Sequence, residues 1–188
     1  MGPAGQVQLF AGGRRAMTLL PHPTVRLVIC GNADRGDDGA ALAAAATLLP
    51  TLSRDLGARL EIRRRPELHV EDLVDLRPDE RCLIVDAVSG VAPGEIVVTP
   101  LAALFEDPGF TPRSSHELPL DRVLALAAII REQPIDGSFV GIGGHRFGYG
   151  TPLSRHARAA LPGFRDAITR ELIRLAAPQS RAGPGMTL

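Results

Sequence analysis

Three short apolar runs, separated by helix-forming segments, constrain the fold more than any other feature of this 188-residue sequence. They cover residues 25–30, 82–88 and 138–142, and the first two consist mainly of Val, Ile and Leu. Nearly continuous apolarity over so few residues is typical of strands buried on both faces. Because helical segments alternate with these runs, the sequence predicts an α/β fold, a single three-layer domain with a twisted, mostly parallel sheet and helices on both faces.

Weaker patterns complete this expected fold. Residues 59–64 alternate apolar and polar side chains, which predicts a strand nearer the sheet edge. Residues 89–94 are expected to form a hairpin turn, so that 95–99 return as the one antiparallel strand. The expected helices cover residues 40–49, 70–76, 120–130 and 153–175, with a potential break in the last at Pro162-Gly163.

The two ends of the chain differ from the middle. Residues 1–24 and 176–188 are rich in Gly and Pro and lack periodicity, so we expect a flexible N-terminal extension and a flexible C-terminal tail. Residues 25–175 are then one domain, since a chain of this length closes a single core.

Charge and composition exclude several classes of protein. The 21 basic residues, all arginine, balance 21 acidic ones, which disfavours nucleic acid or an anionic membrane as the partner. Two cysteines are too few for a disulfide framework. The sequence shows neither a secretory signal nor about 18 consecutive apolar residues, so we expect a cytoplasmic protein.

Acidic side chains follow the first two apolar runs. Asp34, Asp37 and Asp38 lie among glycines between residue 30 and the first helix, and Asp86 ends the second run. Any one aspartate in the first group could cap the helix, but three exceed that need. Asp86 has apolar neighbours, and a carboxylate in such surroundings needs a partner. Functional groups of parallel sheets collect at the carboxyl ends of the strands, where these residues are expected.

His116 is expected at the same edge, because the helix that follows it must run back along the sheet to the strand at 138. An imidazole and two carboxylates suit nickel, zinc or iron as ligands. They also suit general acid–base work on a water molecule. A Ser-His-Asp triad through Ser115 is less favoured, because neighbouring side chains diverge and no G-x-S-x-G turn is present. A cysteine nucleophile is disfavoured as well, since Cys30 and Cys82 lie in apolar runs.

Five glycines between residues 141 and 150 predict a sharply bent loop after the third run. This loop lies at the same edge and could form a groove for a peptide. His145 within it is a secondary candidate for contact with a metal or substrate. A histidine in such a loop is more often simply exposed to solvent.

These segments together resemble the hydrogenase maturation proteases, nickel-dependent endopeptidases that trim the C-terminal extension of the large subunit of nickel–iron hydrogenases. The matching pieces are Gly31-Asn32 with Asp37-Asp38-Gly39, then Ile84-Val85-Asp86-Ala87 with the Pro93-Gly94 turn, and Ser115-His116 with Leu118. The resemblance covers about residues 25–175 in order and at fitting spacing.

The resemblance implies a phosphorylase/hydrolase-like fold and a metal-contacting, catalytic trio of Asp38, Asp86 and His116. The family has Glu or Asp at the first of these positions, so Asp38 is an accepted variant. The implied metal is nickel already loaded into the partner, a hydrogenase large-subunit precursor, with another divalent ion as a substitute in vitro. Many members carry an acidic or amide residue and a proline where this chain has Gly143-Gly144-His145, so the hydrogenase it serves stays open.

Two other functions remain open on the sequence. A non-catalytic nickel-binding assembly factor would use the same trio without cleavage. A hydrolase related to peptidyl-tRNA hydrolases would use Asn, His and Asp at a sheet edge, but it would need a basic surface for tRNA, which zero net charge disfavours.

Overall fold

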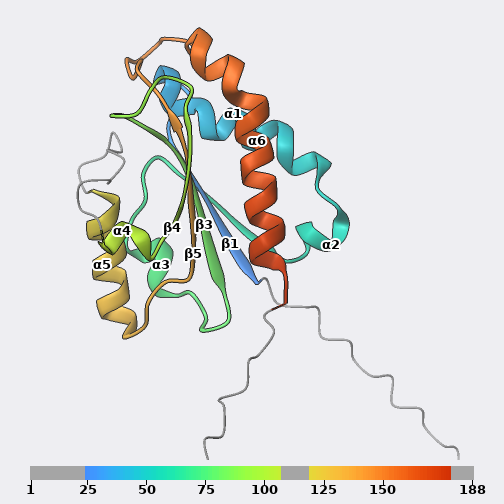
Figure 1. The fold of residues 1–188 in the computed structure, drawn as a ribbon, viewed down its shortest axis with the longest axis vertical. Helices are drawn as coiled ribbons and strands as arrows, with labels where there is room; N and C mark the ends of the chain where they lie inside the picture. Colours follow the sequence, from blue (N-terminus) through green and yellow to red (C-terminus); the bar gives the residue numbers. More distant parts are fainter. Residues whose placement is uncertain (1–23, 107–118, 179–188) are drawn as a thin grey trace, which may run out of the picture.

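The fold is built on one five-stranded sheet with the strand order β2-β1-β3-β5-β4 (Figure 1). The computed structural model describes residues 24–106 and 119–178. The strands are β1 (Val25–Cys30), β2 (Leu60–Arg65), β3 (Arg81–Val88), β4 (Ile96–Pro100) and β5 (Gly137–Gly143). All neighbouring pairs are parallel except β4 and β5, which are antiparallel.

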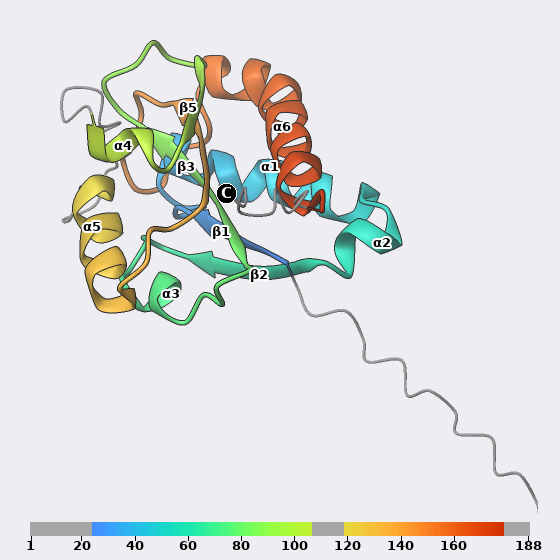
Figure 2. The ribbon, with the colours of Figure 1, turned by 60° about the horizontal axis from the view of Figure 1, so that its bottom comes forward.

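Helices cover both faces of this sheet (Figure 2). The α-helices are α1 (Ala40–Leu48), α2 (Arg54–Gly57), α3 (Glu71–Val74), α4 (Ala103–Glu106), α5 (Leu120–Arg131) and α6 (Arg155–Ala176). Two 3₁₀ turns, η1 (Gly36–Gly39) and η2 (Leu49–Thr51), flank α1. Helices α1 and α6 pack on one face, and α3 and α5 pack on the other. The predicted three-layer α/β fold is therefore confirmed.

The helix pattern follows from apolar side chains at helical spacing. In α6, Phe164, Ile168, Leu172 and Leu175 are all buried against the sheet. They recur every three or four residues and so form one stripe along the helix. Strands β1, β3 and β5 are buried along their length, apart from Arg81 at the start of β3, as expected for strands between two helical layers.

The predicted hairpin between residues 82–88 and 95–99 is wrong. Strand β4 is the antiparallel strand, but it pairs with β5 and not with β3. Burial explains the order, because β5 is wholly buried and suits a position inside the sheet, whereas β4 alternates buried and exposed residues and suits the edge. The turn closes on β5 instead, with Gly94 N–H donating to the Gly143 carbonyl at 2.7 Å.

The potential break in the last helix is not realised. Helix α6 continues through Pro162, which is exposed, and the missing N–H costs the helix one hydrogen bond on its solvent side. The expected helix at 70–76 is shorter, because α3 ends at Val74.

The terminal segments expected to be flexible lie almost entirely outside the described residues. Within the described ranges, none of the helices combines the length and apolarity needed to cross a bilayer.

A buried arginine joins several segments at the β2 edge of the sheet, and it was not predicted from the sequence. Arg26 is only 2% exposed at the second position of β1. Its guanidinium contacts Asp75, lies 3.0 Å from Glu61 Oε2 and lies 3.4 Å from Glu80 Oε2. A buried cation of this kind is tolerated only when carboxylates surround it.

We expect Arg26→Met to lower the free energy of unfolding by about 3–5 kcal/mol, because the buried Glu80 would keep its charge without this partner. Urea denaturation followed by circular dichroism measures the change. The matched control is Arg64→Met on the neighbouring strand, where the side chain is exposed, and it should change stability by less than about 0.5 kcal/mol. Equal losses in the two variants would contradict the interpretation.

Candidate active site

The carboxyl ends of β1, β3 and β5 meet at one edge of the sheet, and the loops that follow them carry the predicted site. The first of these loops turns at Gly31, whose φ of +124° is open to few residues other than glycine. A side chain there would also collide with the backbone, since an added Cβ would lie 2.0 Å from the Asp38 carbonyl oxygen. The glycine therefore lets η1 fold back over the end of β1.

Asp38 lies in this fold-back and is 1% exposed. Its Oδ2 accepts a hydrogen bond from the Asn32 backbone N–H at 2.9 Å. The carboxylate is thus held over the end of β1, by the residue that follows the Gly31 turn. This explains why a glycine precedes the aspartate pair at this spacing.

Asp86 lies in β3 and is 4% exposed. One of its oxygens, Oδ1, accepts a hydrogen bond from the next backbone N–H, that of Ala87, at 2.7 Å. Ile84 and Val88, two residues to either side, belong to the core between the sheet and α5. Since side chains alternate along a strand, Asp86 faces the same side of the sheet.

Cys30 shows that the two carboxylates lie in one neighbourhood. The register pairs Ile29 with Val85, so the next residues along these strands, Cys30 and Asp86, lie side by side. Burial raises the pKa of the Cys30 thiol well above its usual value, and the negative charges of Asp86 and Asp72 raise it further, with a smaller contribution from Asp38. A thiol in this state is a poor nucleophile, which agrees with the expectation that neither cysteine is catalytic.

The third predicted residue, His116, lies outside the described residues. Helix α5 begins four residues after it, at Leu120, and packs on the face that Asp86 shares. Among the residues that the structure describes, no three His, Cys, Asp or Glu side chains form a group able to hold a metal ion. Asp38 and Asp86 thus lie at the same edge of the sheet, and the trio of Asp38, Asp86 and His116 stays a prediction.

Asp37, next to Asp38, has a different position and a different role. Its Oδ1 accepts from the Ser154 backbone N–H at 2.6 Å, and its Oδ2 accepts from the backbone N–H groups of His145 and Arg146 at 3.1 and 3.2 Å. Its own N–H donates to the Arg146 carbonyl at 2.7 Å. Asp37 therefore fixes the glycine-rich loop, residues 144–154, against η1.

These hydrogen bonds control the charge of Asp37. Burial by itself would raise the pKa of this carboxyl, but the hydrogen bonds from Ser154, His145 and Arg146 outweigh it and lower the pKa below its usual value. Asp37 is therefore ionised at neutral pH. We call the Asp37 carboxylate with the backbone N–H groups of His145, Arg146 and Ser154 the Asp37 clamp. The clamp was not predicted from the sequence, because its donors are backbone groups far along the chain. Ser154, a good N-cap residue before α6, was the only local feature that pointed to this segment.

His145 contacts this clamp. Its Nδ1 lies 3.5 Å from Asp37 Oδ2, and its ring meets that of His156 edge to face, with centroids 5.6 Å apart. His145 is partly exposed, with 44% of its side-chain surface accessible. His156, which the sequence did not single out, thus joins His145 beside the site.

The fold also contains a pocket away from these residues. A pocket of about 660 Å³ lies between η2, α2 and the second half of α6, with Leu52, Leu56 and Ile173 in its walls. These segments lie at the amino-end edge of the sheet, opposite Asp38 and Asp86. This pocket is apolar and does not contain the predicted catalytic residues.

Comparisons with known proteins agree with this geometry. A family profile described as "Hydrogenase maturation protease" matches residues 68–171, more than half of the chain. The chain belongs to the hydrogenase maturation protease family. No curated protein matches it in sequence.

Several solved structures share the fold. The endopeptidase HycI from Escherichia coli is 26% identical, with 76% of this chain and 87% of that chain covered and a TM-score of 0.55. The maturating endopeptidase HybD from E. coli is 20% identical over 81% and 93% of the two chains, with a TM-score of 0.63. HybD from Thermococcus kodakarensis is 24% identical over 78% and 97%, with a TM-score of 0.56.

Family membership makes this protein a hydrogenase maturation endopeptidase, as the resemblance implied. It is therefore an enzyme that cleaves a peptide bond within a protein, which argues against the non-catalytic assembly factor and the peptidyl-tRNA hydrolase-like enzyme. The family acts on precursors of hydrogenase large subunits.

We expect Asp37→Asn to lower the free energy of unfolding by about 1–3 kcal/mol at pH 7, because the amide would leave buried backbone N–H groups poorly paired. The difference from wild type should depend on pH. A carboxyl whose pKa is lowered on folding stabilises the fold above its unfolded pKa of about 3.9, and this stabilisation is lost as the pH falls through the folded pKa. The gap between the two proteins should therefore narrow below about pH 4.

Denaturant titrations between pH 3 and pH 7 measure this gap. Asp34→Asn is the matched control, since Asp34 lies in the same loop but is exposed, and its stability should follow that of wild type at every pH. A gap for Asp37→Asn that is the same at pH 3 and pH 7 would contradict the assigned role.

Proposed function

We propose that this protein removes the C-terminal extension of a nickel-loaded hydrogenase large-subunit precursor, and that Asp38, Asp86 and His116 contact the nickel in that substrate. The observation that supports this proposal most directly is the pair of buried carboxylates, Asp38 and Asp86, beside Cys30 at one sheet edge. Burial of a carboxylate is costly, and a cation that binds both residues would offset that cost.

The donor set fits the metal. Carboxylate oxygens and an imidazole nitrogen are suitable ligands for nickel as a divalent ion. Backbone hydrogen bonds orient both carboxylates, from the Asn32 N–H to Asp38 Oδ2 and from the Ala87 N–H to Asp86 Oδ1. Orientation of a ligand by a second hydrogen bond is the usual way in which proteins prepare a metal site.

The same carboxylates supply the acid–base chemistry. Peptide hydrolysis adds a water molecule across the C–N bond, so a base must take a proton from the water and an acid must give one to the leaving amine. In our proposal one of the two aspartates is the base and returns that proton to the amine. Nickel bound in the substrate polarises the groups around the reacting bond.

This arrangement also explains how an immature substrate is rejected. A precursor without nickel contains no metal ion for the three side chains to bind. It therefore forms fewer bonds with the protein and binds more weakly. Only a difference in affinity between two states can select one of them, and nickel supplies that difference.

We expect His116→Ala, Asp38→Asn and Asp86→Asn each to abolish processing, because each removes a proposed ligand. The assay incubates the protein with a nickel-loaded precursor and follows loss of the C-terminal tail by mass spectrometry. The nickel-free precursor should remain uncut with the wild-type protein.

His69→Ala is the control for the histidine variant, because His69 is exposed and its ring contacts only Glu67 among the described residues. This control should process the precursor at the wild-type rate. Normal processing by His116→Ala would show that the assigned role is wrong.

We also expect removal of residues 1–16 to leave the rate of processing unchanged, because the proposed site lies at the carboxyl-end edge and β1 begins only at Val25 at the opposite edge. The same mass assay measures this. A large loss of activity in the truncated protein would place the N-terminal extension in the substrate site.

A further inference from the structure

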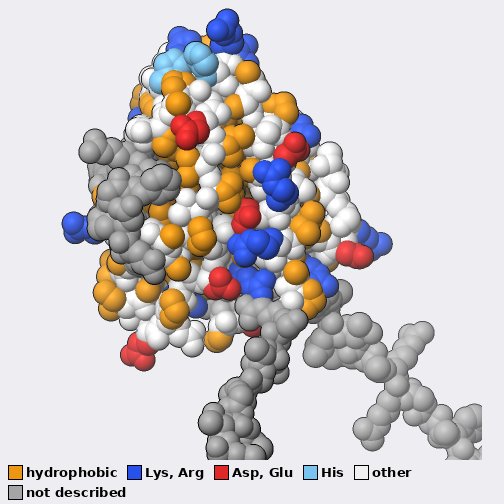
Figure 3. All heavy atoms as spheres, in the orientation of Figure 1, with side chains coloured by type: hydrophobic (Ala, Val, Ile, Leu, Met, Phe, Trp, Pro, Cys, Tyr) orange, Lys and Arg blue, Asp and Glu red, His pale blue; other side chains and the backbone are white. Residues whose placement is uncertain are grey.

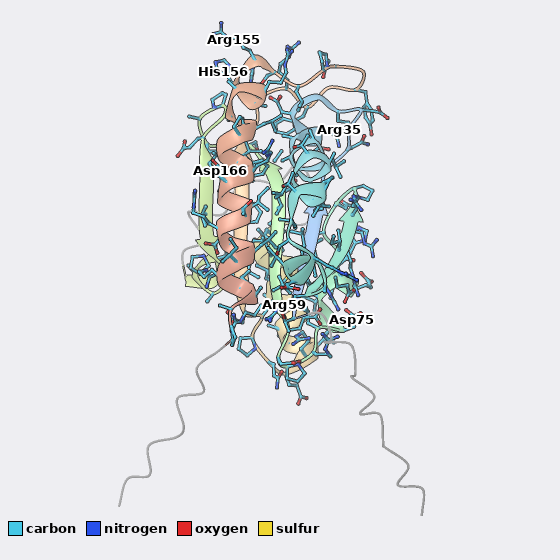
Figure 4. All side chains as sticks on the ribbon, turned by 90° about the vertical axis from the view of Figure 1, so that its right-hand side faces the viewer. Arg35, Arg59, Asp75, Arg155, His156 and Asp166 are labelled. Carbon is cyan, nitrogen blue, oxygen red and sulfur yellow. The ribbon has the colours of Figure 1, made fainter. Side chains whose placement is uncertain are left out.

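Basic and imidazole side chains gather around the candidate site. We define the basic rim as Arg35, His145, Arg146, Arg155 and His156. Figure 3 shows histidine and arginine side chains together at the upper end of the molecule, where the glycine-rich loop meets α6. In Figure 4, Arg155, His156 and Arg35 lie at this end, whereas Arg59 and Asp75 lie at the other.

The rim is held in place by its own contacts. The Asp37 clamp fixes the backbone at His145 and Arg146. Arg35 pairs through its backbone with Thr151 and places its guanidinium carbon 5.1 Å from the centre of the Tyr149 ring, a cation–π contact. Tyr149 is 74% exposed, so this stacked pair is presented to solvent.

Within the described part of the chain, the rim has one ionic contact, between His145 and Asp37, and its arginines have none. No carboxylate there forms an ion pair with Arg35, Arg146 or Arg155, and the last two are exposed. The exposed acids nearby are few. Glu95 already accepts a hydrogen bond from the Ala92 N–H, and Asp34 lies at the outer side of its loop.

Arginines in other parts of the fold are used differently. Arg59 and Arg81 donate to carbonyl groups at the C-terminal end of α6. Arg63 and Arg65 form ion pairs with carboxylates beside α3. The arginines of the rim therefore differ from these in having no carboxylate partner among the described residues, which is the property expected of a surface that binds an anion from outside.

The rim is also close to the proposed catalytic carboxylates. Strand β5 lies beside β3, with Gly141 opposite Asp86 and Gly143 opposite Val88. Gly144 N–H donates to the Val88 carbonyl at 2.8 Å, so the loop leaves the sheet two residues beyond Asp86, about 7 Å along the strand. A peptide cut at Asp86 would pass the rim within a few residues of its cleaved bond.

We propose that the basic rim binds the free C-terminal carboxylate of the substrate's extension. This inference rests on the proposed function, and it adds the part of the substrate that the rim recognises. Every C-terminal extension ends in a carboxylate, whatever its sequence, and the planar guanidinium of arginine matches a carboxylate in two parallel hydrogen bonds. The same arginines make the His145–His156 pair a poor site for a second cation, because like charges repel.

The test compares two nickel-loaded precursors whose synthetic tails, attached by ligation, end either in a carboxylate or in a carboxamide. The wild-type protein should cut both with the same kcat, and KM should be about 10-fold higher for the carboxamide. In the double variant Arg146→Glu/Arg155→Glu, KM should be raised for the carboxylate and should no longer favour it over the carboxamide. If the arginines contact the carboxylate directly, the effect of changing the arginines must depend on whether the carboxylate is present, and this loss of preference measures that dependence.

Arg170→Glu is the matched control, since it makes the same charge change on an exposed position of α6, about 22 Å along the helix from Arg155. It should keep the wild-type preference. If the wild-type protein cuts both precursors with the same KM, this inference is wrong and the proposed function stands. If the wild-type protein cuts neither, the proposed function is wrong and the inference falls with it.

Discussion

The buried carboxylate of Asp37 joins segments that lie far apart in the sequence. It accepts hydrogen bonds from backbone groups 108, 109 and 117 residues away, and it is fully inaccessible to solvent. Without these bonds η1 and the glycine-rich loop would meet only through weaker contacts. Since Asp38 is the next residue, the bonds that fix Asp37 also restrict where the Asp38 carboxylate can lie. The order of the site therefore depends on a residue that is not expected to touch substrate.

Asp37 and Asp38, which are neighbours in one turn, thus have different roles. Asp37 accepts hydrogen bonds from three backbone N–H groups and stays ionised through them, whereas Asp38 accepts a backbone hydrogen bond from Asn32 and is the proposed metal-contacting residue. The glycines on either side make this possible, because Gly31 lets the chain turn back with its backbone against Asp38. Asp86 reaches the same place from another strand, by the register of β1 and β3.

Charge is distributed unevenly over the two ends of the sheet. At the amino-end edge, arginines donate hydrogen bonds to the last carbonyl groups of α6 and form ion pairs with carboxylates around α3. These arginines therefore stabilise the fold. At the carboxyl-end edge, three carboxylates, those of Asp37, Asp38 and Asp86, are buried, and the rim arginines form no ion pair with the described residues. Such an edge suits a substrate that brings both a cation and a carboxylate, as a nickel-loaded precursor with a C-terminal tail would.

The sequence by itself determined the layers of the fold, because burial on both faces leaves nearly continuous apolar runs and helices leave their own periodicity. It also indicated Asp38 and Asp86, since the ends of parallel strands share one edge. Strand order was decided only in the tertiary structure, where burial placed β5 between β3 and β4 against the order of the chain. The Asp37 clamp and the buried Arg26 network were likewise invisible, because their partners are distant in sequence and several are backbone groups, which every residue carries.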